Sequence, residues 1–179
     1  QSTFVAPLVL SPGKTTLNRP QTPLPPFAYA TEEVYFHNEK DHATLCGTLT
    51  YPVGFDKKNS QKVPVVLMVT GSGAQNRDEE LFEHKPFAVL ADYLAKNGIA
   101  SLRYDDRGVG KSIGDLRNAT TYNLSLDALA GVEYLKGLGV FSRVGVLGHS
   151  EGGTIALMLA ACPEAKVDFI VPGKMVFIP

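Results

Sequence analysis

The stretch Arg143-Val144-Gly145-Val146-Leu147-Gly148-His149-Ser150-Glu151-Gly152-Gly153 decides how this chain folds. Its first five residues form a short apolar run of the kind found in buried strands. Residues 151–161 form a helical pattern that is apolar nearly all round, which predicts a buried helix. The turn between them carries the pattern G-x-S-x-G. We therefore predict a strand, a sharp turn and a buried helix, with Ser150 at the turn.

This context makes the turn a candidate nucleophile elbow centred on Ser150. Such a turn holds its serine in strained backbone geometry, and the small residues Gly148 and Gly152 let the strand and the helix approach closely. Ser150 would then stand at the positive end of a helix. A chance match in a glycine-containing turn is the alternative, and the flanking strand and helix favour the catalytic interpretation.

On both sides of this stretch, short apolar runs alternate with helical patterns, which is typical of parallel strands joined by crossover helices. We predict an α/β fold with a doubly wound, mostly parallel sheet in which the 143–147 strand is central. An antiparallel hairpin is expected at one edge of the sheet. The other expected elements are hairpin strands at 33–37 and 43–51, strands at 63–69, 99–104 and 166–171, and helices at 85–96 and 125–138.

The 179 residues, 44% of them hydrophobic and 20% charged, have the composition of one globular domain. Residues 1–29 alternate a short apolar run with a proline-dense stretch. We interpret them as an N-terminal arm or linker, or as the end of a preceding domain. Residues 30–179 then form the α/β domain. The chain begins with Gln1 and not with methionine, which fits the removal of a leader from an exported protein, of a tag or of a preceding domain, and the compartment stays open.

Charge and cysteine usage argue against several kinds of partner. The 17 basic and 18 acidic residues give a formal net charge of -1, which offers no electrostatic footprint for nucleic acid or for an anionic membrane. No apolar run approaches the roughly 20 residues that cross a bilayer, so we expect a soluble protein. Cys46 and Cys162 lack the spacing of a metal site. We expect no cofactor or metal, and a small molecule as the partner.

The residues Thr70-Gly71-Ser72-Gly73 follow the 63–69 strand. Beside a nucleophile elbow, a backbone N–H at this place can bind a developing oxyanion together with the N–H of the residue after the nucleophile. We expect these donors to be Ser72 and Glu151, with a plain strand-to-loop turn as the alternative. A dinucleotide-binding loop is a weak match, because Asn76 stands where its third glycine is required.

The stretch Asp105-Asp106-Arg107-Gly108-Val109-Gly110-Lys111-Ser112 contains Gly-Lys-Ser, as phosphate-binding loops do. Asp105 stands where such a loop requires a glycine, so we reject a nucleotide site here. We interpret the stretch as a turn that is braced by contacts between carboxylates and Arg107.

Four motifs, in this order along residues 19–171, resemble those of bacterial α/β-hydrolases of the esterase and prolyl-oligopeptidase-like group. They are Thr70–Asp78, His84–Phe87, Asp105–Ser112 and Gly148–Gly153. The resemblance implies a serine hydrolase that acts on carboxylic esters through Ser150, or a peptidase with the same machinery. The sequence departs from the family at Thr70, where a histidine is common.

The catalytic acid and histidine of this fold follow the serine along the chain. After Ser150 the sequence holds no histidine and only one aspartate, Asp168. We therefore expect a domain truncated after its sixth strand, and we retain His84 as a candidate pocket residue. A non-catalytic fragment that binds a partner through the uncovered sheet edge stays open. That edge is expected to self-associate or to be covered by residues 175–178.

Overall fold

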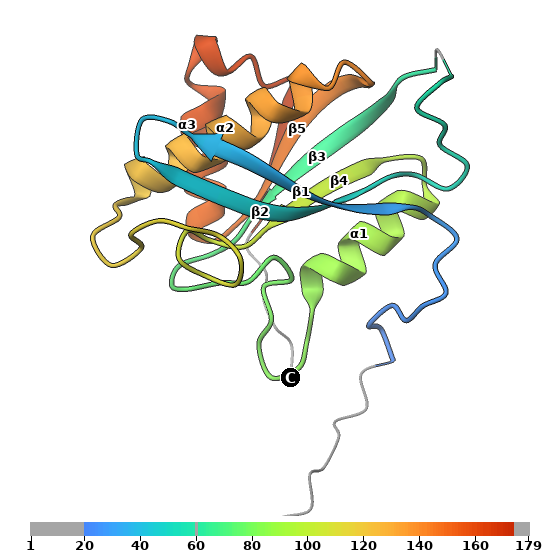
Figure 1. Cartoon of the computed structure of the whole chain (residues 1–179), viewed down its shortest axis with the longest axis horizontal. Coiled ribbons are helices and arrows are strands. Elements are labelled where there is room, and N and C mark those ends of the chain that lie inside the picture. Colours follow the sequence, from blue (N-terminus) through green and yellow to red (C-terminus); the bar gives the residue numbers. More distant parts are fainter. Residues whose placement is uncertain (1–19, 60, 174–179) are drawn as a thin grey trace, which may run out of the picture.

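The computed structural model describes residues 20–59 and 61–173, and its six strands form one mixed sheet (Figure 1). The strands are β1 (Thr31–Asn38), β2 (Ala43–Thr50), β3 (Val63–Val69), β4 (Ala100–Tyr104), β5 (Phe141–His149) and β6 (Phe169–Gly173). Their order across the sheet is β1-β2-β4-β3-β5-β6. β1 and β2 form an antiparallel hairpin, β2 is antiparallel to β4, and the other neighbours are parallel.

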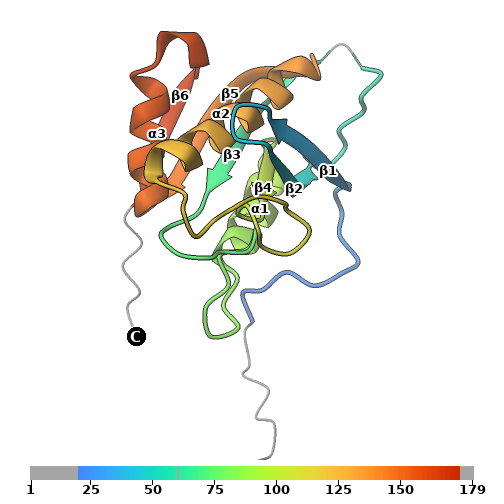
Figure 2. The ribbon, with the colours of Figure 1, turned by 60° about the vertical axis from the view of Figure 1, so that its left-hand side comes forward.

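Helices cover both faces of this sheet (Figures 1 and 2). One face carries α1 (Pro86–Lys96), and the other carries α2 (Thr121–Gly137) and α3 (Glu151–Ala160). A short 3-10 turn, η1 (Pro163–Ala165), leads from α3 toward β6. The predicted α/β fold with a doubly wound, mostly parallel sheet is therefore confirmed.

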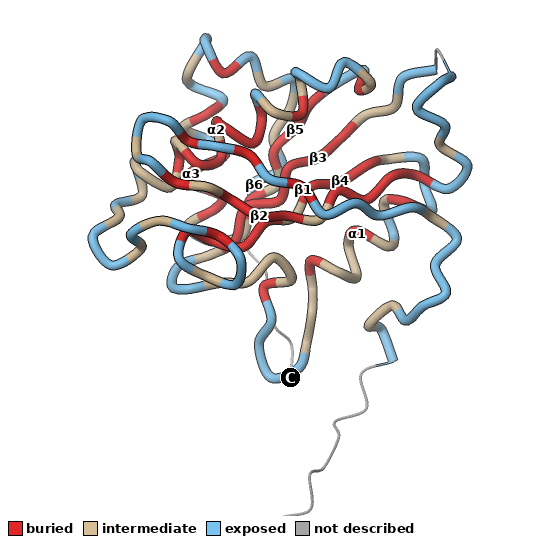
Figure 3. Tube along the Cα trace, viewed as in Figure 1, coloured by how far each residue is buried: buried red, intermediate tan, exposed pale blue. Residues whose placement is uncertain are grey.

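The alternation of side chains along β3 divides the core into two layers. Val65, Leu67 and Val69 pack against the α2 and α3 layer. Val66 and Met68 point the other way and pack against α1. A strand with both faces covered reads as a continuous apolar run, which is the pattern that predicted it. Figure 3 shows buried positions along the strands and exposed ones along most loops.

Two local expectations differ from the structure. Helix α2 begins at Thr121, before the predicted residue 125, because the side chain of Thr120 accepts a hydrogen bond from the N–H of Asn123 and completes a capping box. Helix α3 is not buried all round, since the side chain of Leu157 is 54% exposed. Only one side of α3 packs on the sheet and α2, and Ile155 lies on that side.

The strand before Ser150 lies inside the sheet, with β3 on one side and β6 on the other. β6 is an edge strand and pairs with β5 alone among the described residues. Residues 175–178, expected to cover this edge, lie outside the described residues, so self-association through β6 stays a prediction. The same holds for residues 1–19 of the expected arm, and residues 20–30 contain no helix or strand before β1 begins.

Candidate active site

Ser150 is the single residue between the end of β5 and the start of α3. Its backbone has φ 54° and ψ -115°, an unusual conformation for a residue with a side chain. Backbone hydrogen bonds hold it there: its N–H donates to the carbonyl of Gly173 at 3.0 Å, and its carbonyl accepts from the N–H groups of Gly153 at 2.9 Å and Thr154 at 3.4 Å. Strain of this kind costs about 1–3 kcal/mol and persists only where the surroundings enforce it.

Gly148 and Gly152 let the strand, the turn and the helix fit together. A Cβ atom on Gly148 would lie 1.9 Å from the carbonyl oxygen of Gly152. A Cβ atom on Gly152 would lie 2.2 Å from the carbonyl oxygen of Val69 at the end of β3. Both contacts are with backbone, so neither can be relieved by turning a side chain. The close packing predicted for these two glycines is present.

Ser150 lines two pockets, and Ser72 lines both of them as well. The larger has a volume of about 640 Å³ and includes Glu151, Leu157 and Pro172. The smaller has a volume of about 220 Å³. It lies on the side of the loop that follows β3 and includes Leu81 and His149. The structure thus brings together the three residues singled out for the reaction, Ser72, Ser150 and Glu151, at the carboxyl ends of parallel strands.

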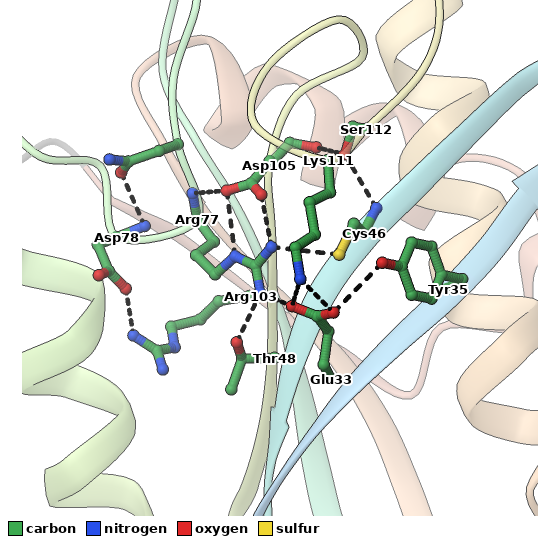
Figure 4. Close-up of polar contacts among 11 residues, drawn as sticks. Glu33, Tyr35, Cys46, Thr48, Arg77, Asp78, Arg103, Asp105, Lys111 and Ser112 are labelled. Carbon is green, nitrogen blue, oxygen red and sulfur yellow. Dashed lines mark hydrogen bonds and ion pairs between the residues drawn. The ribbon is translucent and has the colours of Figure 1, made fainter.

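Two aspartates at the end of β4 fix the loop that carries Ser72. The Asp106 carboxylate accepts hydrogen bonds from the hydroxyl of Thr70 and from the N–H of Gln75, both at 2.9 Å. The Asp105 carboxylate accepts from the N–H of Arg77 at 2.8 Å and from its guanidinium at 2.5 and 3.1 Å (Figure 4). The loop after β3 is therefore anchored at three positions, Thr70, Gln75 and Arg77.

Burial dominates the electrostatics of Asp106. Desolvation raises the pKa of its carboxyl to about 7, the hydrogen bonds from Gln75 and Thr70 oppose that rise, and the charges of Asp127 and Glu151 add to it. For Arg77, the hydrogen bonds to Asp105 raise the pKa of the guanidinium above its ordinary value. The side chain of Arg77 therefore stays charged beside Asp105.

A third carboxylate, that of Glu79, reaches the same loop from within it. Glu79 Oε1 accepts a hydrogen bond from the N–H of Gly71 at 2.7 Å and lies 2.6 Å from Nδ1 of His149. Because the amide of Gly71 is engaged in this way, it is not available to a ligand. The next amide, that of Ser72, has no hydrogen-bond partner among residues 20–59 and 61–173.

The expected bracing of this turn by contacts between carboxylates and Arg107 is present, and both carboxylates come from other segments of the chain. The Arg107 guanidinium donates to Asp127 in α2 at 2.7 and 2.8 Å and to Asp41 in the β1–β2 turn at 3.0 Å. Asp105 turns instead toward Arg77, as described above. Two further contacts hold this turn in place. The hydroxyl of Ser112 donates a hydrogen bond to the carbonyl of Asp105, and Lys111 forms an ion pair with Glu33 (Figure 4).

Two other residues named from the sequence, His84 and Asp168, line neither pocket that contains Ser150. The backbone of His84 forms an isolated antiparallel bridge with that of Leu81, in which each N–H donates to the carbonyl of the other residue. Asp168 hydrogen-bonds the N–H of Val144 near the start of β5, whereas Ser150 follows the end of that strand. Within the part of the chain that the structure describes, no His, Cys, Asp and Glu side chains form a group that could hold a metal. None of its helices has the length and apolar character to span a membrane.

Three comparisons place this geometry among known proteins. Residues 83–172 match the family described as serine aminopeptidase, S33. Esterase EstD of Thermotoga maritima is 34% identical over 127 residues, which are 71% of this chain and 29% of EstD. An acyl transferase of Shewanella hanedai is 43% identical over 87 residues, which are 48% of this chain and 27% of the transferase. The solved structure of Est1E from Butyrivibrio proteoclasticus, with ferulic acid bound, superposes with a TM-score of 0.62 at 27% identity and covers 78% of this chain.

The chain spans less than a third of the two curated relatives and 51% of the Est1E chain. Similarity therefore extends to a part of each relative, and the region that matches the family, residues 83–172, includes the Ser150 turn.

Proposed function

Because this chain belongs to the serine aminopeptidase S33 family of α/β-hydrolases, we propose that Ser150 is the nucleophile of an enzyme that hydrolyses carboxylic esters. One observation carries the proposal. The strained Ser150, at the N-terminal end of α3, lines the same pocket as Ser72, whose N–H has no partner among the described residues. A nucleophile beside an uncommitted backbone donor is the arrangement that acyl transfer requires.

In the proposed reaction, the Ser150 hydroxyl attacks the acyl carbon of the ester and forms a tetrahedral intermediate. The N–H groups of Ser72 and Glu151 receive its oxyanion, and the loss of one such donor typically costs about 10²–10³ in rate. The C–O bond to the alcohol then breaks, the alcohol leaves with a proton, and an acyl-serine remains. Water adds to the acyl-serine and releases the acid, which restores the Ser150 hydroxyl.

The general base of this reaction is proposed to be a histidine outside residues 1–179. No side chain in the described ranges hydrogen-bonds the hydroxyl of Ser150. The ring of His149 is committed to Glu79, and the ring of His37 is paired with Thr44 on the edge hairpin. Without a base, a serine hydroxyl stays protonated and weakly nucleophilic, and an enhancement of about 10³–10⁴ over water remains from the oxyanion donors and binding.

Ser150 lines both pockets, and we expect them to hold the two parts of a small acyl ester. The 640 Å³ pocket has apolar side chains, Leu157 and Pro172, for one half of an ester. The 220 Å³ pocket accommodates the other half beside Leu81. A peptidase that cleaves short peptides through the same serine is the second candidate, because the matched family is described as an aminopeptidase.

The test is turnover of a short-chain p-nitrophenyl ester, beside an amino-acid p-nitroanilide, by the naturally expressed protein and by the 179-residue chain. The expected result is ester cleavage by the natural protein that Ser150→Ala abolishes and that Ser142→Ala, on the same strand, leaves intact. Preferential cleavage of the anilide would favour the peptidase. Ester cleavage that survives Ser150→Ala would refute the proposal.

A non-catalytic fragment that binds a partner through the β6 edge is the remaining candidate for the isolated chain. The edge position of β6 supports it, since an unpaired strand edge can pair with another chain. Sedimentation of the 179-residue chain over a range of concentrations would separate this function from catalysis by a monomer.

A further inference from the structure

Glu79 combines three features that are unusual for a glutamate in a loop. It is 6% exposed, and its backbone has φ 52°, in the left-handed region that residues with a side chain rarely adopt. Its Oε1 atom takes both the N–H of Gly71 and Nδ1 of His149, while its Oε2 atom is buried without a hydrogen-bond partner among the described residues. A buried carboxylate in strained backbone is costly, so a compensating role is expected.

These contacts meet beside Ser150. A Cβ atom built on Gly71 would lie 3.3 Å from Glu79 Oε1, 3.3 Å from Cβ of Ser150 and 3.4 Å from Nδ1 of His149. Glu79 belongs to the loop after β3, whereas His149 is the last residue of β5. Their hydrogen bond therefore ties the loop that carries Ser72 to the strand that presents Ser150, in the wall of the smaller pocket.

The direction of the hydrogen bonds determines which amide faces the nucleophile. The N–H of Gly71 donates to Glu79, which leaves the following amide, that of Ser72, as the proposed oxyanion donor because Ser72 lines both pockets that contain Ser150. An ionised carboxylate only accepts hydrogen bonds, so with Glu79 ionised the contact at 2.6 Å requires Nδ1 of His149 to be the donor. A carboxylate without hydrogen-bond donors beside Ser150 would repel a developing oxyanion. The hydrogen bonds that Glu79 accepts from Gly71 and His149 offset part of its negative charge.

We propose that Glu79 is a positioning residue for the acyl-transfer reaction, and that it acts with His149 to hold Gly71 so that the N–H of Ser72 faces Ser150. The inference rests on the proposed role of Ser150. Glu79 lies in the wall of the smaller pocket, its Oε1 atom is engaged by Gly71 and His149 and its Oε2 atom is buried, so its proposed role is to hold the loop and not to react with the substrate.

The first test measures the loop without reference to activity. Hydrogen exchange of the Gly71 amide is followed in the naturally expressed protein and in its Glu79→Ala and Glu80→Gln variants. Loss of a hydrogen bond to a charged group predicts exchange about 10- to 100-fold faster in Glu79→Ala. Glu80→Gln, an exposed neighbour in the same loop, should leave the exchange unchanged. Thermal unfolding shows whether each variant is folded. If Glu79→Ala is not folded, the milder Glu79→Gln variant takes its place.

The second test measures ester turnover. Glu79→Ala should lower kcat about 10- to 100-fold and change KM less than threefold, because the interaction that it disturbs is made in the transition state. His149→Asn keeps a donor near the position of Nδ1 and should retain most of kcat, whereas His149→Leu should lose it as Glu79→Ala does. This rescue by the conservative variant would not be seen if His149 only filled space.

The outcomes separate the two ideas. If Ser150→Ala abolishes turnover while Glu79→Ala leaves both kcat and Gly71 exchange unchanged, the positioning role is refuted and the proposed function stands. If turnover survives Ser150→Ala, the proposed function fails, and accelerated exchange of Gly71 in Glu79→Ala would still support the anchoring of the loop.

Discussion

Asp127 binds Arg107 through both carboxylate oxygens, and this ion pair is almost completely buried. Asn38, at the end of β1, donates a further hydrogen bond to Asp127 at 2.7 Å, and Asp41 in the following turn accepts from Arg107. The pair therefore joins the edge hairpin, the turn after β4 and helix α2. These segments lie far apart in the sequence, so the pair fixes how they meet.

Arg107→Ala should lower the free energy of unfolding by about 3–5 kcal/mol, because it leaves the carboxylate of Asp127 buried without its partner. Urea unfolding at neutral pH measures the change. Arg117→Ala, at an exposed position, is the control and should stay within about 0.5 kcal/mol of wild type. Equal effects of the two substitutions would show that the ion pair contributes nothing specific.

The raised pKa of Asp106 predicts an unusual pH dependence of stability. A carboxyl with a pKa of about 7 in the folded state, against an ordinary value of 3.8, holds its proton more tightly when the protein is folded. Its contribution is thus fully present below about pH 4 and is lost as the pH rises through 7, by up to about 4 kcal/mol. The stability of wild type relative to Asp106→Asn should therefore fall between pH 4 and pH 7. A difference that stays flat or rises over this window would contradict the assignment.

Gly148→Ala and Gly137→Ala should have opposite effects on stability. At Gly148 a methyl group meets the backbone of Gly152, so the turn must shift, at a cost of about 1–3 kcal/mol or more. At Gly137, the last residue of α2, nothing lies within 4 Å, and alanine should stabilise the helix by about 0.5–1 kcal/mol. Chemical denaturation of both variants measures the sign. Tolerance of alanine at Gly148 would mean that strand and helix are not in close contact there.

Ser150→Gly should make the protein more stable while it removes the nucleophile. Glycine adopts a φ of 54° without strain, so we expect a net gain of about 1 kcal/mol. Ser142→Gly, within β5, should instead destabilise by about 0.5–1 kcal/mol. The melting temperatures of the two variants, compared with wild type, provide the measurement. A loss of stability at both positions would argue that Ser150 is unstrained.

The sheet could be predicted because its strands carry their own signal. Val63–Val69 is apolar throughout since both of its faces are covered, and the pattern around Ser150 requires close packing that glycines supply. The predicted start of α2 lies too late in the sequence. The capping box between Thr120 and Asn123 extends the helix beyond the apolar stripe on which the prediction rests. The exposure of Leu157 could not be predicted from the sequence of α3. An apolar side chain favours burial, but the sequence of the helix does not show whether another element covers that side chain.

The supports of the site could not be predicted for a different reason. The run Arg77-Asp78-Glu79-Glu80 contains three consecutive acidic residues, and nothing in the sequence distinguishes Glu79 from its neighbours. Only the fold of the loop buries the side chain of Glu79. Likewise, Arg107 lies beside carboxylates in its own turn, yet its partners are 20 and 66 residues away. Ion pairs between distant segments depend on tertiary structure and leave no local pattern.

The anchoring of the loop after β3 by Asp105, Asp106 and Glu79 has a consequence for directed evolution of this scaffold. Libraries aimed at new substrates would ordinarily randomise charged residues near the serine first. Here such changes would scramble the backbone that aims the amide of Ser72. Diversity introduced at Leu81, Leu157 and Pro172, which line the pockets without holding the loop, should give more folded and selectable clones from the same number of transformants.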